Sequence, residues 1–431
     1  MYCIYEYILD SQEHFFYQIY PQSFYDSNNN GIGDINGITL KLDYLKNLDV
    51  DIIWLSPVYD SPNYDNGYDI RDYFKIMTEF GTMDDFGRML SEMKRCELKL
   101  VMDLVANHSS DEHPWFIDSK KSKDNPYPDF YHWAPGKDGK APNEWEAGLG
   151  MNDTYDILTD EYYLHTFTSK QPDLKWENRI VRQEVYKIIR WWLDKVLGVD
   201  GLRMNVINFI SKAPRYPEGE IYGNAEYSHG SPCFVNGPHV HDYLQEMNEQ
   251  VLRHYNIVTI GECPGANIID AHLFSCTQRK ELDMIFTFEH MSLDGGRRDM
   301  EVIPRIGVNP NFIEVNVEDA LKDPRSIYYY YYQKLIELRR TMPIIVYGKY
   351  DILHQEHEHI FIYRRYNENL NNKIIVACNF SQQPMKIDNA QLSERLTKCG
   401  HLLISNYEKM GNSNYLDFRS YETWTIEMKQ S

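Results

Sequence analysis

The sequence lacks the paired cysteines that mark a disulfide framework or a zinc site. Seven cysteines are scattered along 431 residues, an odd number with no C-x-x-C pair among them. Neither kind of cross-link is therefore expected to hold this fold together, and the cysteines are interpreted as reduced thiols. They are Cys3, Cys96, Cys233, Cys263, Cys276, Cys378 and Cys399.

Positive charge is also scarce, because 44 Lys and Arg stand against 64 Asp and Glu for a formal net charge of -20. Such a chain repels nucleic acid and anionic membrane surfaces. No stretch reaches the roughly 18 uninterrupted apolar residues that a spanning helix needs. The N-terminal segment has Glu6 and Asp10 where a secretory signal would be positively charged, and it lacks a small-residue cleavage site. We expect a cytoplasmic protein with neither nucleic acid nor membrane as a partner.

Aromatic residues are abundant, at 14% of the chain with 34 tyrosines. Aromatic rings stack on the apolar faces of sugars, so this composition suits a carbohydrate cleft. It fits a general bias towards tyrosine equally well, and composition alone does not separate the two interpretations. The run Tyr328–Tyr332 precedes apolar residues at helical spacing, which predicts a helix. With 42% apolar residues, the chain can bury the cores of one large and one smaller domain.

Short apolar runs alternate with amphipathic stretches, a pattern typical of βαβ units and a parallel sheet. The clearest helix spans 181–196, where apolar residues recur at helical spacing along one face. We therefore predict an α/β fold, a (β/α) barrel of TIM type. The expected strands are 16–20, 52–56, 98–104, 199–204, 257–262 and 284–288.

After the third expected strand, the periodic pattern gives way to a polar and aromatic segment that is too long for a simple loop. We interpret residues 106–176 as a subdomain inserted into a barrel domain that spans 12–345. The β-rich runs that follow predict a C-terminal antiparallel β-sandwich over 346–431. These runs are HIFIYRRY, KIIVACNF, HLLISNY and ETWTIEM.

In a (β/α) barrel the reacting groups lie where strands end on the C-terminal face. The third strand leads into LVMDLVANH, the fourth into VDGLRMNVIN and the fifth into TIGECPG. With SPVYDSPNYDNGYDI after the second strand and QPDLKWEN before the fourth, these motifs resemble, in order, those of the α-amylase superfamily of glycoside hydrolases. The resemblance is strongest to the oligo-1,6-glucosidase subgroup, with dextran glucosidases and sucrose isomerases. It runs from about Tyr17 to Glu289 and resumes at Val308.

The resemblance implies a role for each matching residue. Asp65 and Tyr68 in DNGYDI stand where the family binds the non-reducing glucose, and His108 in VANH contacts the same sugar. Arg203 in GLRMN stands where an arginine orients the catalytic nucleophile. Glu262 in IGECPG stands at the general acid, which must carry a proton for the leaving oxygen. Any one of these residues alone would more often be structural, but their appearance in order favours the site.

At the position of the nucleophile the family has aspartate, whereas this chain has Asn205. A retaining glycosidase uses two carboxyl groups about 5 Å apart, one as acid and one as nucleophile. A carboxamide is neutral and a poor nucleophile, and losing such a group typically costs on the order of 10³ to 10⁶ in turnover. Asn205 alone therefore predicts a nearly inactive protein.

A second difference follows Gly296. The family continues with a seventh and an eighth βα unit, whereas this chain passes through RRDMEVIPRI and resumes the resemblance at Val308. At about 30 residues per βα unit, the intervening stretch is too short for even one. We therefore expect a barrel that lacks its last two strands, together with the family's His-Asp pair that grips the sugar in the transition state. Two exposed sheet edges would favour instability or association.

The segment DSNNNGIGD resembles the calcium loop of the family, in which alternating oxygens surround a hard cation. Asn30 stands where an aspartate is usual, and each lost negative charge weakens calcium affinity. The resemblance implies calcium as a structural metal, and a metal-free turn rich in Asn and Gly is the alternative. The matching residues are Asp26, Asn28, Asn30, Ile32 and Asp34.

Val206, directly after the nucleophile position, resembles the α-1,6-acting members of the family. The expected ligand is a small α-glucoside or oligosaccharide, with no organic cofactor. Two functions remain open: an α-glucosidase with lost or severely impaired catalysis, and a non-catalytic sugar-binding or scaffolding protein or the product of a decaying gene. The amino-acid-transporter heavy chains that share this fold are disfavoured, because the sequence has no membrane anchor.

Overall fold

The computed structural model describes residues 14–121, 127–137, 140–143, 145–147, 150–195, 198–221, 228–288, 327–353, 357–367, 370–387, 400–407 and 416–429. They form two compact units, the first mainly from residues 16–288 and the second mainly from residues 327–429. The junction between 296 and 308, where the sequence predicts two missing βα units, lies outside the described residues, as do Cys3 and Cys399.

A six-stranded sheet runs through the first unit in the order β1-β2-β5-β11-β12-β13, and each neighbouring pair is parallel. The order in space follows the order in the chain, as successive βα units of a barrel require. All six predicted strands are confirmed, with ends that differ by one or two residues. The strands are β1 (Phe16–Ile19), β2 (Ile52–Leu55), β5 (Lys99–Val105), β11 (Gly201–Asn205), β12 (Val258–Glu262) and β13 (Met284–Phe286).

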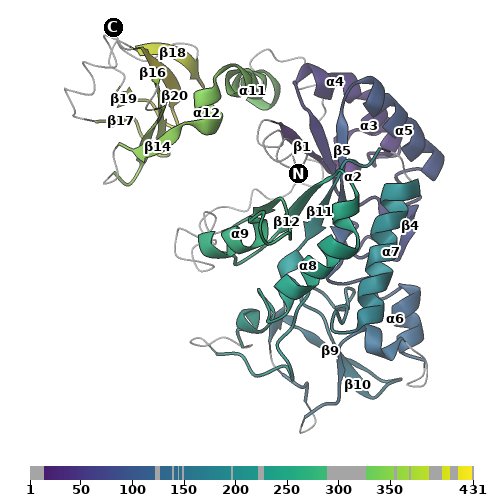
Figure 1. Ribbon diagram of the computed structural model, residues 1–431. Coiled ribbons are helices and arrows are strands. Elements are labelled where there is room, and N and C mark those ends of the chain that lie inside the picture. The colour runs from purple at the N-terminus through teal and green to yellow at the C-terminus, as the bar shows by residue number, and fades with distance from the viewer. Residues whose placement is uncertain are drawn as a thin grey trace. The chain divides into compact units, whose positions relative to one another are not determined.

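Helices from the segments between these strands lie along the sheet (Figure 1). The predicted helix over 181–196 is confirmed as α7, and its apolar face is buried from Val181 to Trp192. Burying an apolar side chain of this kind stabilises the folded state by about 1.5–3 kcal/mol relative to leaving it exposed. The helix α5 begins at a capping box, in which Thr82 and Asp85 accept from each other's backbone N–H. The helices are α2 (Pro21–Phe24), α3 (Ile35–Leu40), α4 (Leu42–Asn47), α5 (Met83–Arg95), α6 (Pro114–Ser119), α7 (Arg179–Lys195), α8 (Val240–Gln250) and α9 (Ile268–Ser275), with short 3-10 turns η1 (Pro128–Phe130), η2 (Ile207–Phe209), η3 (Ser231–Cys233) and η4 (Leu252–His254).

The segment interpreted as an insertion carries short antiparallel strands. A three-stranded sheet has the order β6-β10-β9, and β7 pairs with β8. A further hairpin joins β3 to β4 after β2. The strands are β3 (Tyr59–Asp60), β4 (Asp72–Ile76), β6 (Trp133–Ala134), β7 (Glu146–Ala147), β8 (Gly150–Met151), β9 (Asp153–Asp156) and β10 (Glu161–Leu164).

Close approach of two strands and apolar packing both stabilise the barrel sheet. At Gly201, a Cβ atom would lie 2.5 Å from Cγ1 of Val258, so β11 and β12 approach closely only because glycine lacks a Cβ atom. The buried cluster consists of Ile52, Val101, Val258 and Ile260, against which Phe16, Trp54 and Met284 pack. This apolar packing fixes the strands whose polar residues form the site described below.

The second unit contains a five-stranded antiparallel sheet in the order β14-β15-β16-β20-β18 and a small sheet of β17 and β19. Residues of both sheets share one buried cluster that includes Ile362, Phe418 and Trp424. The four β-rich runs of the sequence are confirmed as β15, β16, β18 and β20. The strands are β14 (Lys349–Ile352), β15 (Ile360–Asn367), β16 (Leu370–Asn379), β17 (Met385–Lys386), β18 (Gly400–Ser405), β19 (Asp417–Phe418) and β20 (Thr423–Lys429).

Two helices, α11 (Tyr332–Thr341) and α12 (Pro343–Tyr347), group with the second unit, and the boundary expected at 345/346 falls inside α12. The reason is packing, because the guanidinium of Arg365 in β15 donates to three backbone carbonyls in and after α12. The tyrosine run forms a π-helical turn, η7 (Ile327–Tyr331), that leads into α11, so the helix predicted there is confirmed. No helix in the described part of the chain has both the length and the apolar character needed to cross a membrane.

Candidate active site

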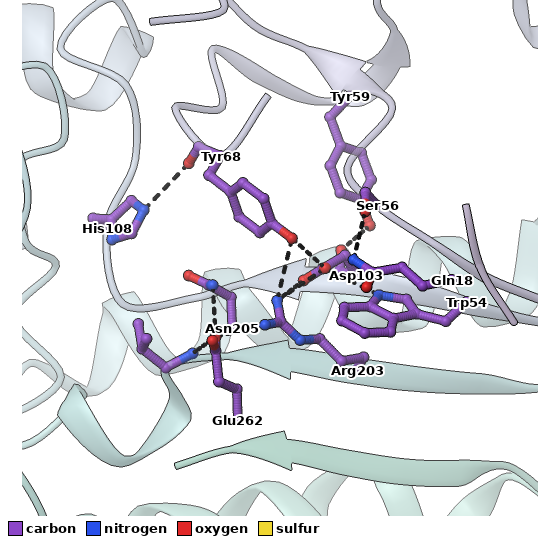
Figure 2. Close-up of polar contacts among 11 residues, drawn as sticks. Gln18, Trp54, Ser56, Tyr59, Tyr68, Asp103, His108, Arg203, Asn205 and Glu262 are labelled. Carbon is purple, nitrogen blue, oxygen red and sulfur yellow. Dashed lines mark hydrogen bonds and ion pairs between the residues drawn. The ribbon is translucent and has the colours of Figure 1, made fainter. Parts of the chain in front are cut away.

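A buried ion pair between Asp103 of β5 and Arg203 of β11 lies at the centre of the candidate site (Figure 2). Nη1 of Arg203 donates to both oxygens of Asp103 at 2.9 Å. The indole of Trp54 and the hydroxyl of Tyr68 donate to Oδ2 of the same carboxylate, at 3.1 and 3.0 Å. Burial raises the pKa of Asp103 to about 6, although Arg203 and the other donors oppose the rise. These contacts fix the position of the guanidinium.

Glu262, at the end of β12, receives three donors on a single oxygen. Oε2 lies 2.6 Å from Nη2 of Arg203, 2.9 Å from Nδ2 of Asn205 and 3.0 Å from the backbone nitrogen of Val206. An oxygen that accepts three bonds suits a carboxylate, which only accepts. All three donors thus converge on one oxygen of the residue that the resemblance places at the general acid.

Asn205 contacts Glu262 directly, and this contact differs from the spacing of a working pair. Two carboxyl groups of a retaining glycosidase stand about 5 Å apart, because like charges repel and the sugar carbon lies between them. The amide of Asn205 instead donates to Glu262 at 2.9 Å. The neutral side chain at this position is thus in direct contact with Glu262, whereas two carboxylates would repel each other.

Two polar atoms of the site are buried without a hydrogen-bond partner: Nε of Arg203 and Oδ1 of Asn205. Arg203 forms ion pairs with Asp103 and Glu262 and donates no hydrogen bond to Oδ1 of Asn205. Buried polar groups without partners are unfavourable in a folded protein. One free donor and one free acceptor beside a carboxylate are groups that a sugar hydroxyl can pair with.

The residues expected around the non-reducing glucose form a second cluster. Nε2 of Gln171 donates to Oδ2 of Asp65 at 2.8 Å and lies 3.2 Å from Nε2 of His108. Asn107 lies 3.2 Å from Nδ1 of His108, which leaves Nε2 to donate to the carbonyl of Tyr68 at 3.2 Å. Burial lowers the pKa of His108 to about 4. His108 is thus neutral near pH 7 and acts in this cluster as a hydrogen-bonding group.

A fully buried ion pair between Lys212 and Asp173 lies next to this cluster and contacts Asn107. Nζ of Lys212 lies 2.8 Å from Oδ2 of Asp173, and their side chains are 1% and 0% exposed. Lys212 also donates to Oδ1 of Asn107 at 2.8 Å and to the carbonyl of Phe209 at 2.6 Å. Asp173 lies two residues after Gln171, and Asn107 precedes His108. The pair therefore joins both segments that carry the residues of this cluster to the chain after β11.

The expected calcium loop brings its residues into one turn between α2 and α3. Asp26 accepts from the backbone of Asn28, Asn29 and Gly31, and Asp34 caps α3 by accepting from Gly37. The side-chain oxygens of Asn28 and Asn30 accept from the backbone two residues on. His, Cys, Asp and Glu alone form no group of three suited to a metal within the described residues, so a cation here depends on amide and carbonyl oxygens. An all-oxygen set with two carboxylates fits a hard cation such as calcium.

The structure brings Arg203, Asn205, Val206 and Glu262 together and places Tyr68 over the same network (Figure 2). Asp65 and His108 meet through a residue that the sequence did not single out. Four further residues of the site, which are polar and buried, were not predicted from the sequence: Asp103, Gln171, Asp173 and Lys212. The first three lie inside the motifs LVMDLVANH and QPDLKWEN, and this position in a motif is the signal that could have identified them.

Residues 18–304 match the family model described as "Alpha amylase, catalytic domain". This stretch exceeds half of the chain and contains the parallel sheet from the second half of β1 onwards, together with every residue of the network around Arg203 and Glu262. The chain therefore belongs to the α-amylase catalytic-domain family, and the predicted membership and TIM-barrel fold class are confirmed.

The most similar relatives include an oligo-1,6-glucosidase from Parageobacillus thermoglucosidasius, 41% identical over 535 aligned positions that cover 91% of this chain and 94% of the relative. A trehalose-6-phosphate hydrolase from Bacillus subtilis is 49% identical over 280 positions, 64% of this chain and 48% of that protein. A solved variant of the trehalose-6-phosphate hydrolase from Bacillus licheniformis has a TM-score of 0.82 at 28% identity, covering 97% of this chain and 99% of its own. The chain is thus similar to hydrolases of both names.

Proposed function

We propose that this protein binds small α-glucosides of isomaltose type and hydrolyses them only very slowly. The observation that carries the proposal is Asn205, a neutral side chain bonded to Glu262 at 2.9 Å where a retaining hydrolase needs a second carboxylate. The 41% identity to an oligo-1,6-glucosidase supports the α-1,6 preference that Val206 suggests. Binding and impaired turnover are compatible, because Asp65, Tyr68 and His108 are all present around the sugar pocket.

The length of the aligned relative is a second argument for the same proposal. The alignment with the Parageobacillus thermoglucosidasius enzyme is 535 positions long, whereas this chain has 431 residues. The relative therefore carries residues that have no counterpart here. We place this shortening between Gly296 and Val308, where the sequence predicts the loss of two βα units and of the sugar-gripping His-Asp pair.

A non-catalytic sugar-binding protein is the second candidate. It is favoured by the unpartnered Nε of Arg203 and Oδ1 of Asn205, which a bound hydroxyl would satisfy whether or not a glycosidic bond breaks. The two candidates share the pocket and differ only in turnover.

The test is to measure isomaltose binding by calorimetry and release of p-nitrophenol from p-nitrophenyl α-glucoside, both with freshly purified protein. We expect binding with turnover lower than that of an active relative by on the order of 10³ or more. Asp65→Ala should abolish binding, since it removes the carboxylate bonded to Gln171. Asp72→Asn, which alters a surface ion pair with Lys75, is the matched control and should bind normally.

Rapid hydrolysis that disappears in Glu262→Gln would contradict the impaired-catalysis proposal and imply that another group replaces the nucleophile. Absence of binding by protein shown to be folded by circular dichroism would contradict both candidates and favour a decaying gene.

We also propose that the loop of Asp26, Asn28, Asn30, Ile32 and Asp34 holds a calcium ion. Bound calcium should raise the melting temperature by a few degrees, because a ligand that binds only the folded state stabilises it. Asp26→Asn removes one of the two charges and should remove most of this shift. A melting temperature that is the same in calcium and in EDTA would refute the proposal.

A further inference from the structure

Glu262 touches two nitrogens of a single dipeptide. Its Oε2 lies 2.9 Å from Nδ2 of Asn205 and 3.0 Å from the backbone nitrogen of Val206 (Figure 2). These two nitrogens are the ones whose protons must move when an asparagine loses its side-chain amide through attack by the next residue. One carboxylate thus reaches both ends of that proton transfer.

We propose that Asn205 is a self-modification site, at which Glu262 promotes deamidation of the side chain to a carboxylate. The nitrogen of Val206 attacks Cγ of Asn205 while Glu262 takes its proton. The Cγ–Nδ2 bond then breaks, and the proton passes from Glu262 to the departing nitrogen, which leaves as ammonia. The product is a five-membered cyclic imide. One water molecule opens it, and attack at Cγ gives aspartate, whereas attack at the backbone carbonyl gives isoaspartate. The net change is an amide and water giving an acid and ammonia, with no redox partner.

The backbone at this point suits the reaction. Asn205 is the last residue of β11, and Val206 already turns into the left-handed region at φ 35 and ψ 44. The Val206 nitrogen lies beyond the end of the strand, and its N–H donates to Glu262. The Glu262 side chain is 17% exposed, so water reaches its edge of the site.

Asn208 provides a natural comparison three residues further on. It is fully buried, and its amide donates to Oδ1 of Asn236 and to the carbonyl of Pro264. Both acceptors are neutral, so no carboxylate bridges its amide and the following backbone nitrogen. The environment, rather than burial, therefore distinguishes Asn205.

The consequence rests on the function proposed above, in which position 205 is that of the nucleophile. Deamidation would restore a carboxylate there, and turnover of a p-nitrophenyl α-glucoside would rise as the protein ages. The chemical event itself is read by mass and does not depend on that function.

The experiment is to incubate the full-length folded protein at neutral pH and digest it with trypsin at intervals in heavy-oxygen water. Cleavage after Arg203 and Lys212 releases residues 204–212, one peptide that contains both Asn205 and Asn208. Deamidation that occurred before digestion gains ordinary oxygen, whereas deamidation during digestion gains heavy oxygen. Fragment ions assign the site. We expect Asn205 to convert with time and Asn208 to remain an amide.

Glu262→Gln is the decisive variant, since it keeps the shape but replaces the proton-accepting carboxylate. We expect it to slow conversion by about 100-fold, a typical contribution of a general base. Val206→Gly should accelerate conversion, because glycine adopts a positive φ without strain and leaves the attacking nitrogen less hindered. Equal rates at Asn205 and Asn208, or an unchanged rate in Glu262→Gln, would overturn the proposal. Conversion to aspartate, which fragment ions distinguish from isoaspartate, without a gain in turnover would support the modification and count against the proposed function.

Discussion

Replacing Asn205 by aspartate is expected to raise hydrolysis of p-nitrophenyl α-glucoside by about 10³-fold or more over freshly purified parent protein. The variant supplies a negatively charged oxygen that attacks the anomeric carbon and then leaves as the glycosyl ester is hydrolysed. The parent amide does neither. Initial rates at saturating substrate measure the change.

The same substitution acts on Glu262. In the parent protein, the amide of Asn205 donates to Oε2 at 2.9 Å, alongside Arg203 at 2.6 Å. An aspartate cannot donate and places a second negative charge beside Glu262. Like charges favour the protonated form of one partner, and a general acid needs that form. One change is thus expected to supply the nucleophile and the charge that keeps the acid protonated.

Two controls define the result. Asn205→Asp combined with Glu262→Gln should lose most of the gained activity, because the leaving oxygen then has no proton donor. Asn205→Ser changes the side chain without adding charge and should stay at the parent level. If folded Asn205→Asp protein shows no gain, the idea that position 205 limits turnover is wrong. The proposed loss of two βα units between Gly296 and Val308 would then be the expected cause of the missing hydrolysis.

Lys212→Met is expected to lower the free energy of unfolding by about 3–5 kcal/mol. The change leaves the 0%-exposed side chain of Asp173 without its cation and removes the donor to Asn107. A buried charge without a partner is strongly destabilising, whereas a matched apolar pair in its place is often tolerated. Urea unfolding at neutral pH, followed by tryptophan fluorescence, measures the loss.

The control is Lys187→Met, which disrupts a surface pair with Glu184 whose lysine is 63% exposed, and it should change stability by less than about 1 kcal/mol. A penalty for Lys212→Met no larger than that of the control would show that the buried pair contributes little. The pH dependence gives a second check. Burial raises the pKa of Asp173, but the charge and hydrogen bond of Lys212, together with His108 and the backbone N–H of Thr166, lower it below its usual value.

A carboxylate with a lowered pKa contributes stability above its unfolded pKa, and this contribution is lost as the pH falls through the folded value. Without Lys212, burial raises the pKa, and Asp173 takes up a proton at a higher pH. The penalty of Lys212→Met should therefore be largest near neutral pH and shrink as the pH falls towards 4.

Much of the fold was predictable because its signal is local. Each of the six strands of the parallel sheet lies in a short, largely apolar run, and α7 repeats its apolar residues at helical spacing. The C-terminal strands β15, β16, β18 and β20 likewise lie in β-rich runs that are visible in the sequence. The position of α11 and α12 was not predictable, since their helical pattern says nothing about the unit against which they pack.

Only those site residues that match positions in the family motifs could be predicted from the sequence. Glu262, Arg203 and Asn205 follow from the order of the strand ends. Gln171, in contrast, looks like an ordinary loop residue until the insertion folds back and places its amide 2.8 Å from Asp65, 106 positions away in the chain. Lys212 reads as a surface lysine in the sequence, and only its near-complete burial reveals a structural charge.

The sequence by itself determined the barrel strands, the C-terminal β unit, the family resemblance and the identity of the residue at position 205, since all of these are written in local order and composition. Only the tertiary structure decided what that residue does. Burial of Asp103 and Arg203, and convergence of β11 on β12, bring Asn205, Val206 and Glu262 within hydrogen-bond distance. Such contacts depend on the distance between atoms and on the exclusion of water, and a linear pattern encodes neither.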